Sequence, residues 1–427
     1  MSKGKRGVHH KYSVAVISPE FRPYTNGGGA ATFNEELAHV LSDIGLDVHV
    51  ISFHPEGKVF QKKLGDNITH HLIGLKTDIK ALNFIYHKCI RPFLSLTFFR
   101  LPELFFVVEW NFFCWWYFRK LHKEKHFIAI HSPSYHCPSL LIKLLYKKIY
   151  LSIHIQGPQE GLNKYIFKNL DYELKARLER LFTTRFSDVV VTCNMSIAQQ
   201  LDSLPIRPKR TIYIPNFISN LPTNTIEQPN LDNLVFWGRI EYRKGVEVLI
   251  NTYLQLRNRN KKLRLWLIGE VAPSLRMGSR FVSLQEYLDN LNVSEELKHG
   301  IYHVPKIDNK ETLKSLIRML NGICIFPSLH EPFGFVYIEA MSMGMITIGT
   351  SSGEGKLIIV EGKSGFVSDP TVKGLTNTLK TIFSLSNSEL LSIAMAARKR
   401  VEMDYSSQAV AGKYRDIYSE VFNVEII

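Results

Sequence analysis

Short apolar segments alternate with stretches of helical periodicity along the chain, and this alternation restricts the fold more than any other feature. Runs of this length and composition are typical of strands buried on both faces of a parallel sheet. Strands that alternate with helices predict an α/β fold in which helices cover both faces of the sheet. We therefore expect buried strands at residues 12–18, 47–53, 127–131, 150–155 and 188–192, and again at 234–238, 263–269, 301–304, 322–326 and 345–349.

A polar, proline-containing stretch without periodicity, residues 216–231, separates the alternation into two parts. The chain of 427 residues is long enough for two α/β domains of about 200 residues each. The simplest architecture is two doubly wound, Rossmann-like domains that face each other across a cleft, with ligands at the carboxyl ends of the strands. We predict that these domains span residues 1–217 and 218–404.

Composition narrows the class of protein. Apolar residues make up 45% of the chain and charged residues 22%, which is ordinary for a globular enzyme and argues against disorder. The net charge of +14 indicates an acidic partner, which can be a nucleotide, a nucleic acid or an anionic membrane. Five scattered cysteines, without a C-x-x-C pair, indicate buried thiols in a reducing compartment. No secretory segment precedes the first strand, so we expect a cytoplasmic protein.

The stretch 326–344 carries the strongest functional pattern in the chain. An apolar strand ends in a Pro/Ser loop that contains Glu331, and a helical pattern begins near Gly334. Glu339 lies about a turn and a half into this helix. The unpaired N–H groups at the helix start therefore point toward the same space as both carboxylates. Such a site suits a sugar joined to a nucleoside diphosphate, with phosphate on the backbone donors and hydroxyls on the carboxylates.

Two further motifs suit a diphosphate. Arg239 and Lys244 lie in the loop after the first strand of the second domain, where preplaced cations can neutralise the charge of a leaving nucleoside diphosphate. We expect these cations to replace a metal ion, and no Asp-x-Asp pair suited to a metal is seen. Gly28 and Gly29 open the first helix of the first domain, where glycines allow close backbone approach and a helix N-terminus favours an anion. A plain tight turn explains these glycines equally well.

Together these motifs resemble the family-4 retaining glycosyltransferases, which have the two-domain GT-B fold. The resemblance covers about residues 12–416, and the Glu331–Glu339 and Arg239–Lys244 blocks are its most specific parts. It implies that a hexose is transferred with retention from a UDP or GDP sugar to a saccharide or lipid-linked saccharide, as in polysaccharide biosynthesis, without a metal or other cofactor. It also implies that the last helix, within residues 405–427, packs back on the acceptor-side first domain, while the second domain binds the donor.

The resemblance also implies individual roles. Glu331 would contact hydroxyls of the donor sugar and Glu339 the ribose, Arg239 and Lys244 would hold the diphosphate, and His154 would lie beside the sugar. The leaving phosphate oxygen would take the acceptor proton on the same face, so no nucleophile is assigned. The catalytic set is therefore His154, Glu331, Arg239 and Lys244, and the donor-binding set is Gly28, Gly29, Arg239, Lys244, Glu331, Phe333, Gly334, Phe335, Val336 and Glu339.

Some residues depart from the family pattern. His154 ends an apolar strand, where a buried core histidine is the usual finding, and an extra Ile-Gln separates it from Gly157. His131, in Ile-His-Ser-Pro-Ser, fits the other strand-terminal histidine of the family. After the second Glu, the family has two adjacent glycines and then an acid, but here Glu354 interrupts the glycines and Leu357 stands where the acid is expected. Either Glu354 takes that place or the contact is missing.

Residues 84–118 are rich in aromatic side chains and are followed by Arg119 and Lys120. The longest apolar run, broken by Glu109 and Asn111, is too short to span a bilayer. Two interpretations stay open. The segment is either a core helix of the first domain or a helix that lies in the membrane interface. The second interpretation, together with the positive net charge, predicts a peripheral protein at the inner membrane face with anionic lipid as a partner.

Three other functions compete with sugar transfer. A nucleotide-sugar epimerase of the same fold would bind the donor and need no acceptor site. A non-catalytic nucleic-acid-binding protein fits the basic charge, but paired carboxylates in the groove would repel phosphate, so we expect no nucleic-acid partner. A nicotinamide-dependent dehydrogenase would need the G-x-G-x-x-G fingerprint and an acid after the second strand, and both are missing.

Overall fold

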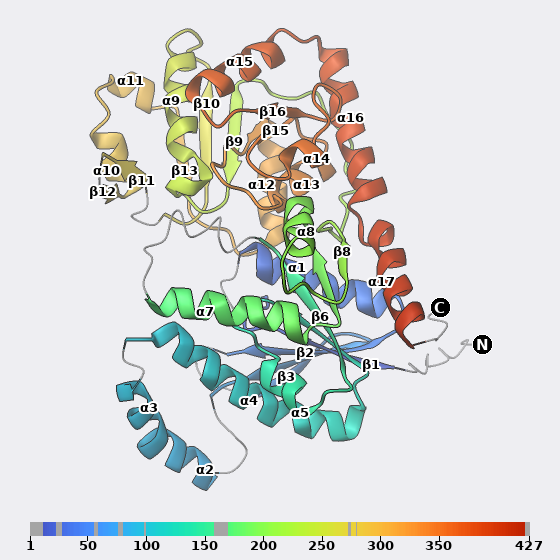
Figure 1. Cartoon of the computed structure of the whole chain (residues 1–427). Coiled ribbons are helices and arrows are strands. Elements are labelled where there is room, and N and C mark those ends of the chain that lie inside the picture. Colours follow the sequence, from blue (N-terminus) through green and yellow to red (C-terminus); the bar gives the residue numbers. More distant parts are fainter. Residues whose placement is uncertain are drawn as a thin grey trace, which may run out of the picture. The chain divides into compact units, whose positions relative to one another are not determined.

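The structure is a computed structural model that describes residues 12–22, 28–54, 59–75, 80–97, 100–157, 170–271, 275–278 and 280–422. The chain divides into two compact units. The first unit comprises Met1–Ser219 together with Val410–Ile427, and the second comprises Asn220–Ala409. Each unit is built on a parallel or mainly parallel sheet with helices around it (Figure 1). This confirms the predicted α/β class with Rossmann-like domains.

The sheet of the first unit has the strand order β3-β4-β2-β1-β5-β6-β7-β8 among the described residues. All neighbouring strands are parallel except the edge strand β3, which is antiparallel to β4. Apart from this edge, the order is that of a doubly wound sheet, which places functional side chains at the carboxyl ends of the strands. The strands are β1 (Ser13–Ile17), β2 (Asp47–Phe53), β3 (Phe60–Gly65), β4 (Ile68–Ile73), β5 (Ala129–Pro133), β6 (Tyr150–Ile155), β7 (Val189–Thr192) and β8 (Thr211–Tyr213).

Helices cover both faces of this sheet. On one face, Trp110 and Phe118 of α4 pack with Ile130 and Leu151 in a fully buried apolar cluster. On the other face lie α1 and α17, and α1 and α4 are on opposite sides of the sheet in Figure 1. The helices are α1 (Gly29–Asp43), α2 (Lys80–Ile85), η1 (Tyr86–Ile90), α3 (Arg91–Thr97), α4 (Pro102–Lys125), α5 (Leu140–Leu145), α7 (Leu170–Leu181), η2 (Phe182–Phe186), α8 (Met195–Asp202) and α17 (Ser407–Phe422).

Helix α4 contains most of the aromatic segment that allowed two interpretations. It begins at Pro102, which suits the first turn of a helix, and Asp171 of α7 caps it by accepting from the N–H groups of Glu103 (2.8 Å) and Leu104 (3.0 Å). Trp110 and Phe118 are fully buried. The centre of the aromatic run therefore belongs to the core. Within the described residues, no helix is both long and apolar enough to cross a membrane.

The sheet of the second unit is parallel throughout, with the strand order β13-β10-β9-β14-β15-β16 among the described residues. This is the doubly wound order of a dinucleotide-binding sheet. Its strands are β9 (Asn233–Trp237), β10 (Arg264–Ile268), β13 (Ile301–Val304), β14 (Ile323–Ile325), β15 (Thr347–Thr350) and β16 (Phe366–Ser368), and a separate hairpin pairs β11 (Leu275–Met277) with β12 (Arg280–Val282).

The helices of the second unit begin with the short turn η3, which follows β9, and four of the later helices begin at a side-chain cap. Ser283, Asn309, Thr371 and Ser386 each accept a hydrogen bond from a backbone N–H of the first turn. The elements are η3 (Tyr242–Lys244), α9 (Val246–Arg257), α10 (Leu284–Asp289), α11 (Glu295–Lys298), α12 (Lys310–Leu320), α13 (Phe335–Ser342), α14 (Gly355–Ile358), α15 (Val372–Phe383) and α16 (Asn387–Asp404).

Candidate functional site

The loops that follow β9 and β14 pack against each other at the carboxyl edge of the second sheet. The N–H of Leu329 donates to the carbonyl of Arg243 (2.9 Å), which ties the β14 loop to η3. Gly245 ends η3 in the left-handed region (φ 68°), and a Cβ there would lie 1.9 Å from the carbonyl oxygen of Pro327. Only glycine allows this close approach. The two loops therefore hold their side chains in a fixed relation.

This packing brings Lys244 and Glu331 together. The Lys244 Nζ lies 2.5 Å from Glu331 Oε2, and both side chains are largely buried. Ser328 Oγ donates to the same carboxylate oxygen (3.2 Å). Burial alone would raise the pKa of Glu331, but the charge and hydrogen bond of Lys244, helped by Arg243 and Ser328, hold it below the usual value. Glu331 is therefore an ionised carboxylate that faces a cation.

Arg239 and Arg243 differ in exposure although both lie near Glu241. The Arg239 side chain is 62% exposed, and its Nη2 lies 3.5 Å from Glu241 Oε1. Arg243 is mostly buried, where it donates to Glu241 Oε1 (2.8 Å) and to the carbonyl of His330 (3.1 Å). Arg239 is thus available to a ligand, whereas Arg243 holds the loop.

Among the described residues, no group of three or more His, Cys, Asp or Glu side chains could hold a metal ion.

Glu339 lies on α13 and faces the end of β9. Its Oε2 accepts a hydrogen bond from Trp237 Nε1 (3.2 Å), and the Trp237 ring packs edge-on against Phe326 (centroids 4.6 Å apart). Gly334 caps α13 with a φ of 100°, and its carbonyl accepts from the N–H of Tyr337 (3.0 Å). The N–H of Tyr337, one of the backbone donors that we expect to face a ligand at this helix start, is therefore already hydrogen-bonded within the turn.

The remaining predicted donor-binding residues lie around this helix start. Phe333 is buried, and its ring packs against Phe335 and Tyr405, so its side chain supports the loop. Phe335 and Val336 are half-buried in the first turn of α13. No described contact tests the ligand roles of these residues, and their roles stay predictions.

Gly28 and Gly29 lie at the start of α1, after the carboxyl end of β1. Both are exposed, and a Cβ built on Gly28 would meet nothing within 4 Å. Among the described residues, no atom therefore blocks a ligand from the backbone at Gly28, and the role of these glycines in binding an anion stays a prediction. The neighbouring Asn26 and Gly27 lie outside the described residues.

His154 and His131 form a buried pair in the first unit. His131 Nδ1 lies 2.9 Å from His154 Nε2, and His131 Nε2 lies 2.6 Å from the hydroxyl of Tyr418 on α17. Burial lowers the pKa of His131 to about 3, and burial next to His131 lowers the pKa of His154 well below its usual value. Both imidazoles are therefore neutral at pH 7. His154 is 2% exposed and its ring packs against Phe33, which is the environment of a core histidine.

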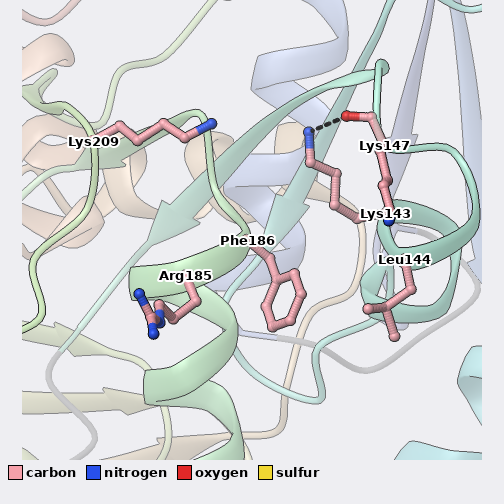
Figure 2. A pocket seen from close by; sticks show the side chains of 6 residues that line it. All are labelled: Lys143, Leu144, Lys147, Arg185, Phe186 and Lys209. Carbon is pink, nitrogen blue, oxygen red and sulfur yellow. Dashed lines mark hydrogen bonds between the residues drawn. The ribbon is translucent and has the colours of Figure 1, made fainter.

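A cavity of about 200 Å³ lies in the first unit, lined by Lys143, Leu144, Lys147, Arg185, Phe186 and Lys209 (Figure 2). These residues precede β6, β7 and β8, so the cavity lies at the amino ends of the strands, away from the carboxyl edge. Asp188 pairs with two of the cations, Lys143 (2.6 Å) and Lys209 (2.7 Å). This basic cavity is therefore separate from the glycines of α1.

Sequence reasoning missed three residues of the second-unit site: Trp237, Arg243 and Ser328. Trp237 closes an apolar strand and looks like core, and Ser328 lies in a loop of ordinary composition. Arg243 is adjacent to Lys244, so a basic doublet was visible. This basic doublet in a tight turn is the signal that could have found Arg243.

Two family models match the chain, and together they cover most of both units. The model described as Glycosyltransferase Family 4 matches residues 27–219, and the model described as Glycosyl transferases group 1 matches residues 224–400. The chain is 24% identical to the uncharacterized glycosyltransferase YqgM of Bacillus subtilis (strain 168) over 309 residues, which is 71% of this chain and 80% of the relative. It is 25% identical to glycogen synthase of Mycobacterium tuberculosis (strain H37Rv) over 239 residues, 55% of this chain and 54% of the relative.

Solved structures of glycosyltransferases share the fold. Sucrose-phosphate synthase from Thermosynechococcus elongatus matches with a TM-score of 0.69 at 20% identity, over 97% of this chain and 100% of that chain. Anabaena HepE in complex with UDP-glucose matches with a TM-score of 0.64 at 14% identity, over 96% of this chain and 100% of that chain. The family models, the relatives and the shared fold agree with one another, and the chain belongs to the family-4 glycosyltransferases of the GT-B fold.

Proposed function

We propose that this glycosyltransferase moves a hexose from a nucleoside-diphosphate sugar to a saccharide or lipid-linked saccharide, with retention at the anomeric carbon and without a metal ion. The observation that carries the proposal is the cluster at the carboxyl edge of the second sheet. There, Glu331 and Glu339 present carboxylates on either side of the α13 start, and Lys244 and Arg239 supply positive charge. Carboxylates accept from sugar hydroxyls, and cations bind a diphosphate.

A nucleotide-sugar donor is further supported by the similar fold of Anabaena HepE, whose structure contains UDP-glucose. In our proposal, Glu339 accepts from the ribose and Glu331 from hydroxyls of the sugar. Lys244 and Arg239 stabilise the negative charge that develops on the leaving diphosphate, which is the role that a metal ion plays in other transferases. We retain Gly28 and Gly29 as donors to the diphosphate, and His154 as a residue that lies beside the sugar.

The proposed step conserves the configuration of the sugar. The bond between the anomeric carbon and the diphosphate oxygen breaks, and a bond to the acceptor oxygen forms on the same face. The acceptor proton goes to the departing phosphate oxygen, so the products are a glycoside and a free nucleoside diphosphate. No side chain of the described residues needs to form a covalent intermediate in this scheme.

The donor is tested first by thermal shift with UDP, GDP and ADP. A nucleotide at 100 times its Kd stabilises the protein by about 2.7 kcal/mol. The matching nucleotide sugar is then incubated with saccharide acceptors and with lipid-linked acceptors, and the anomeric configuration of the product is read by NMR. We expect a glycoside of retained configuration, whereas an inverted product or a free epimerised sugar would overturn the proposal.

Metal independence is tested with the same assay. Arg239→Ala should lower kcat by about 10²-fold, the range seen when one transition-state charge stabiliser is removed, and excess EDTA should change nothing. Because the Arg239 side chain is 62% exposed, the free energy of unfolding of the variant should lie within about 0.5 kcal/mol of the wild-type value. Loss of turnover on chelation would show that a metal ion neutralises the diphosphate instead.

A further inference from the structure

The segment between β4 and α4 exposes large apolar side chains that the proposed transfer does not use. Helices α2, η1 and α3 form one continuous helical run, because Ile85 and Arg91, which flank η1, both have right-handed helical backbone angles. Along this run Phe84 is 65% exposed, Phe93 69% and Leu96 77%. Apolar side chains gathered in this way on a surface mark an interaction site.

The opposite face of the run is anchored to α4 and to the end of β4. Tyr86 is buried, and its hydroxyl donates to Glu109 Oε1 (2.6 Å), while Arg91 Nε donates to the same oxygen (2.8 Å). His87 Nε2 lies 2.7 Å from the carbonyl of Leu75. These polar contacts set the orientation of the run and hold its apolar side chains on the solvent-exposed face. In Figure 1, α2 and α3 extend away from α4 at the lower left.

The charge of this segment has one sign. Between residues 80 and 102 the chain contains Lys80, Lys88, Arg91 and Arg100 and no Asp or Glu. Lys80 and Lys88 are exposed, and the Arg91 side chain remains 46% exposed beside Glu109. Apolar side chains together with cations on one short helical run are typical of a helix that lies in the interface of an anionic bilayer.

We propose that α2, η1 and α3 form a docking surface for an anionic lipid bilayer. Phe84, Phe93 and Leu96 insert at the boundary between headgroups and acyl chains, and Lys80 and Lys88 contact lipid phosphates. The run connects the carboxyl end of β4 to the start of α4, which places it on the same edge of the first sheet as Gly28 and Gly29. A bilayer docked there would supply a lipid-linked acceptor to that edge.

The surface differs from the aromatic run that first suggested membrane contact. Trp115 packs against the core cluster of the first unit, and the guanidinium of Arg119 lies 4.1 Å from the ring centre of Trp116. These two tryptophans are half-buried on α4. The residues to change are therefore those of the run from 84 to 96, not those of α4.

The test is sedimentation of the full chain with vesicles in the absence of any sugar donor, so that its result does not depend on the proposed transfer. We expect binding to phosphatidylcholine vesicles that contain about 30 mol % phosphatidylglycerol at about 50 mM salt, weaker binding at about 0.5 M, and little binding to pure phosphatidylcholine. Lys80→Glu with Lys88→Glu should weaken binding by about tenfold or more. The matched pair Lys262→Glu with Lys363→Glu, exposed lysines of the second unit, changes the net charge equally and should bind nearly as the wild type does.

The apolar contribution is tested by Phe84→Ser, Phe93→Ser and Leu96→Ser in one chain, which should abolish the binding that persists at high salt. The control is Met319→Ser, Met395→Ser and Met403→Ser, which removes three equally exposed apolar side chains from the second unit. All five cysteines are described, and Cys89 is the exposed one. The emission of a polarity-sensitive dye attached to Cys89 should therefore shift to shorter wavelength when the protein binds anionic vesicles.

Three outcomes would overturn the proposal. The first is absence of binding to anionic vesicles at low salt. The second is an equal loss of binding in the control variants, which would show that net charge or general apolar exposure explains it. The third is self-association without lipid that the Phe84, Phe93 and Leu96 changes abolish, which would assign the surface to a second copy of the chain.

Discussion

Replacing Lys244 by methionine should destabilise the second unit at neutral pH, because the change leaves the Glu331 carboxylate buried beside an apolar side chain. The Lys244 side chain is 17% exposed and that of Glu331 11%, and their charged atoms lie 2.5 Å apart. Breaking a fully buried pair by removing one partner costs about 3–5 kcal/mol. Ser328 and Arg243 still face Glu331 in the variant, so we expect a loss of about 2–3 kcal/mol in the free energy of unfolding.

The loss should depend on pH in a direction that the structure sets. Burial raises the pKa of Glu331, but the charge and hydrogen bond of Lys244, together with Arg243 and Ser328, keep the pKa below the usual 4.5. A carboxyl group whose pKa is lower in the folded state contributes stability above its unfolded pKa, and this contribution is lost as the pH falls through the folded value. The difference between wild type and Lys244→Met should therefore be full near pH 7 and shrink below pH 4.5.

The two units need not unfold together, so the readout is hydrogen exchange of β9 and β14 peptides, which reports on the second unit alone. Lys244→Met combined with Glu331→Gln should recover most of the lost protection, since a neutral amide needs no cation. This double variant should still lack transfer activity. Equal protection of wild type and Lys244→Met at pH 7, or an equal loss at pH 4 and pH 7, would refute the assigned pairing.

Two further predictions each concern the removal of one hydrogen-bonding group. Trp237→Phe keeps an aromatic ring beside Phe326 and removes the Nε1 donor to Glu339, so kcat/KM for the donor should fall by about tenfold, and an unchanged value would remove Trp237 from the site. The smaller ring at this 5% exposed position should also cost about 1–2 kcal/mol in the free energy of unfolding. Tyr418→Phe removes the hydroxyl that lies 2.6 Å from the buried His131 Nε2 and should cost about 1–3 kcal/mol in urea unfolding of the first unit. Tyr414→Phe is its control, because the buried Tyr414 hydroxyl has no hydrogen-bond partner among the described residues and its loss should cost almost nothing.

Strands in which apolar residues predominate could be predicted closely from the sequence. The expected ranges 47–53, 150–155 and 301–304 coincide with β2, β6 and β13. Glycine, proline or polar residues lie within two positions of each end of these runs, so the pattern of apolar and turn residues places the strands. The same reasoning supports both sheets, since a strand buried on two faces carries few polar side chains.

Strand β4 could not be predicted in this way because it buries two consecutive histidines, His70 and His71. His70 Nε2 lies 2.7 Å from Ser52 Oγ, and His71 Nε2 lies 2.8 Å from His49 Nδ1. Burial lowers the pKa of His70 to about 4 and that of His71 to about 3, so both are neutral and fit an apolar sheet. Their partners lie on β2 and become visible only once the two strands are aligned.

The donor side of the site was predictable as a set of residue types but not as a set of contacts. Arg239, Arg243 and Lys244 look alike in the sequence, and their different exposures depend on the left-handed turn at Gly245 and on the bond between Leu329 and Arg243. Both features need the β14 loop, which is distant along the chain. Local sequence therefore identifies the basic loop, whereas tertiary packing decides which cation meets Glu331.

The stretch after β15 shows how a departure from the family pattern can keep its structural role. Glu354 separates two glycines, yet each glycine still lies where a side chain would collide with backbone. A Cβ on Gly353, whose φ is 126°, would lie 1.8 Å from the carbonyl oxygen of Glu331, and a Cβ on Gly355 would lie 2.3 Å from that of Thr350. The N–H of Glu331 donates to the carbonyl of Ser352 (3.2 Å), so this loop also fixes the backbone of Glu331. Both close approaches are kept with Glu354 between the glycines, where it is 5% exposed and stands at the N-cap position of α14. The position of Glu331 thus depends on backbone contacts from two loops, and these contacts require glycine at 245 and 353 whatever residue stands at 354.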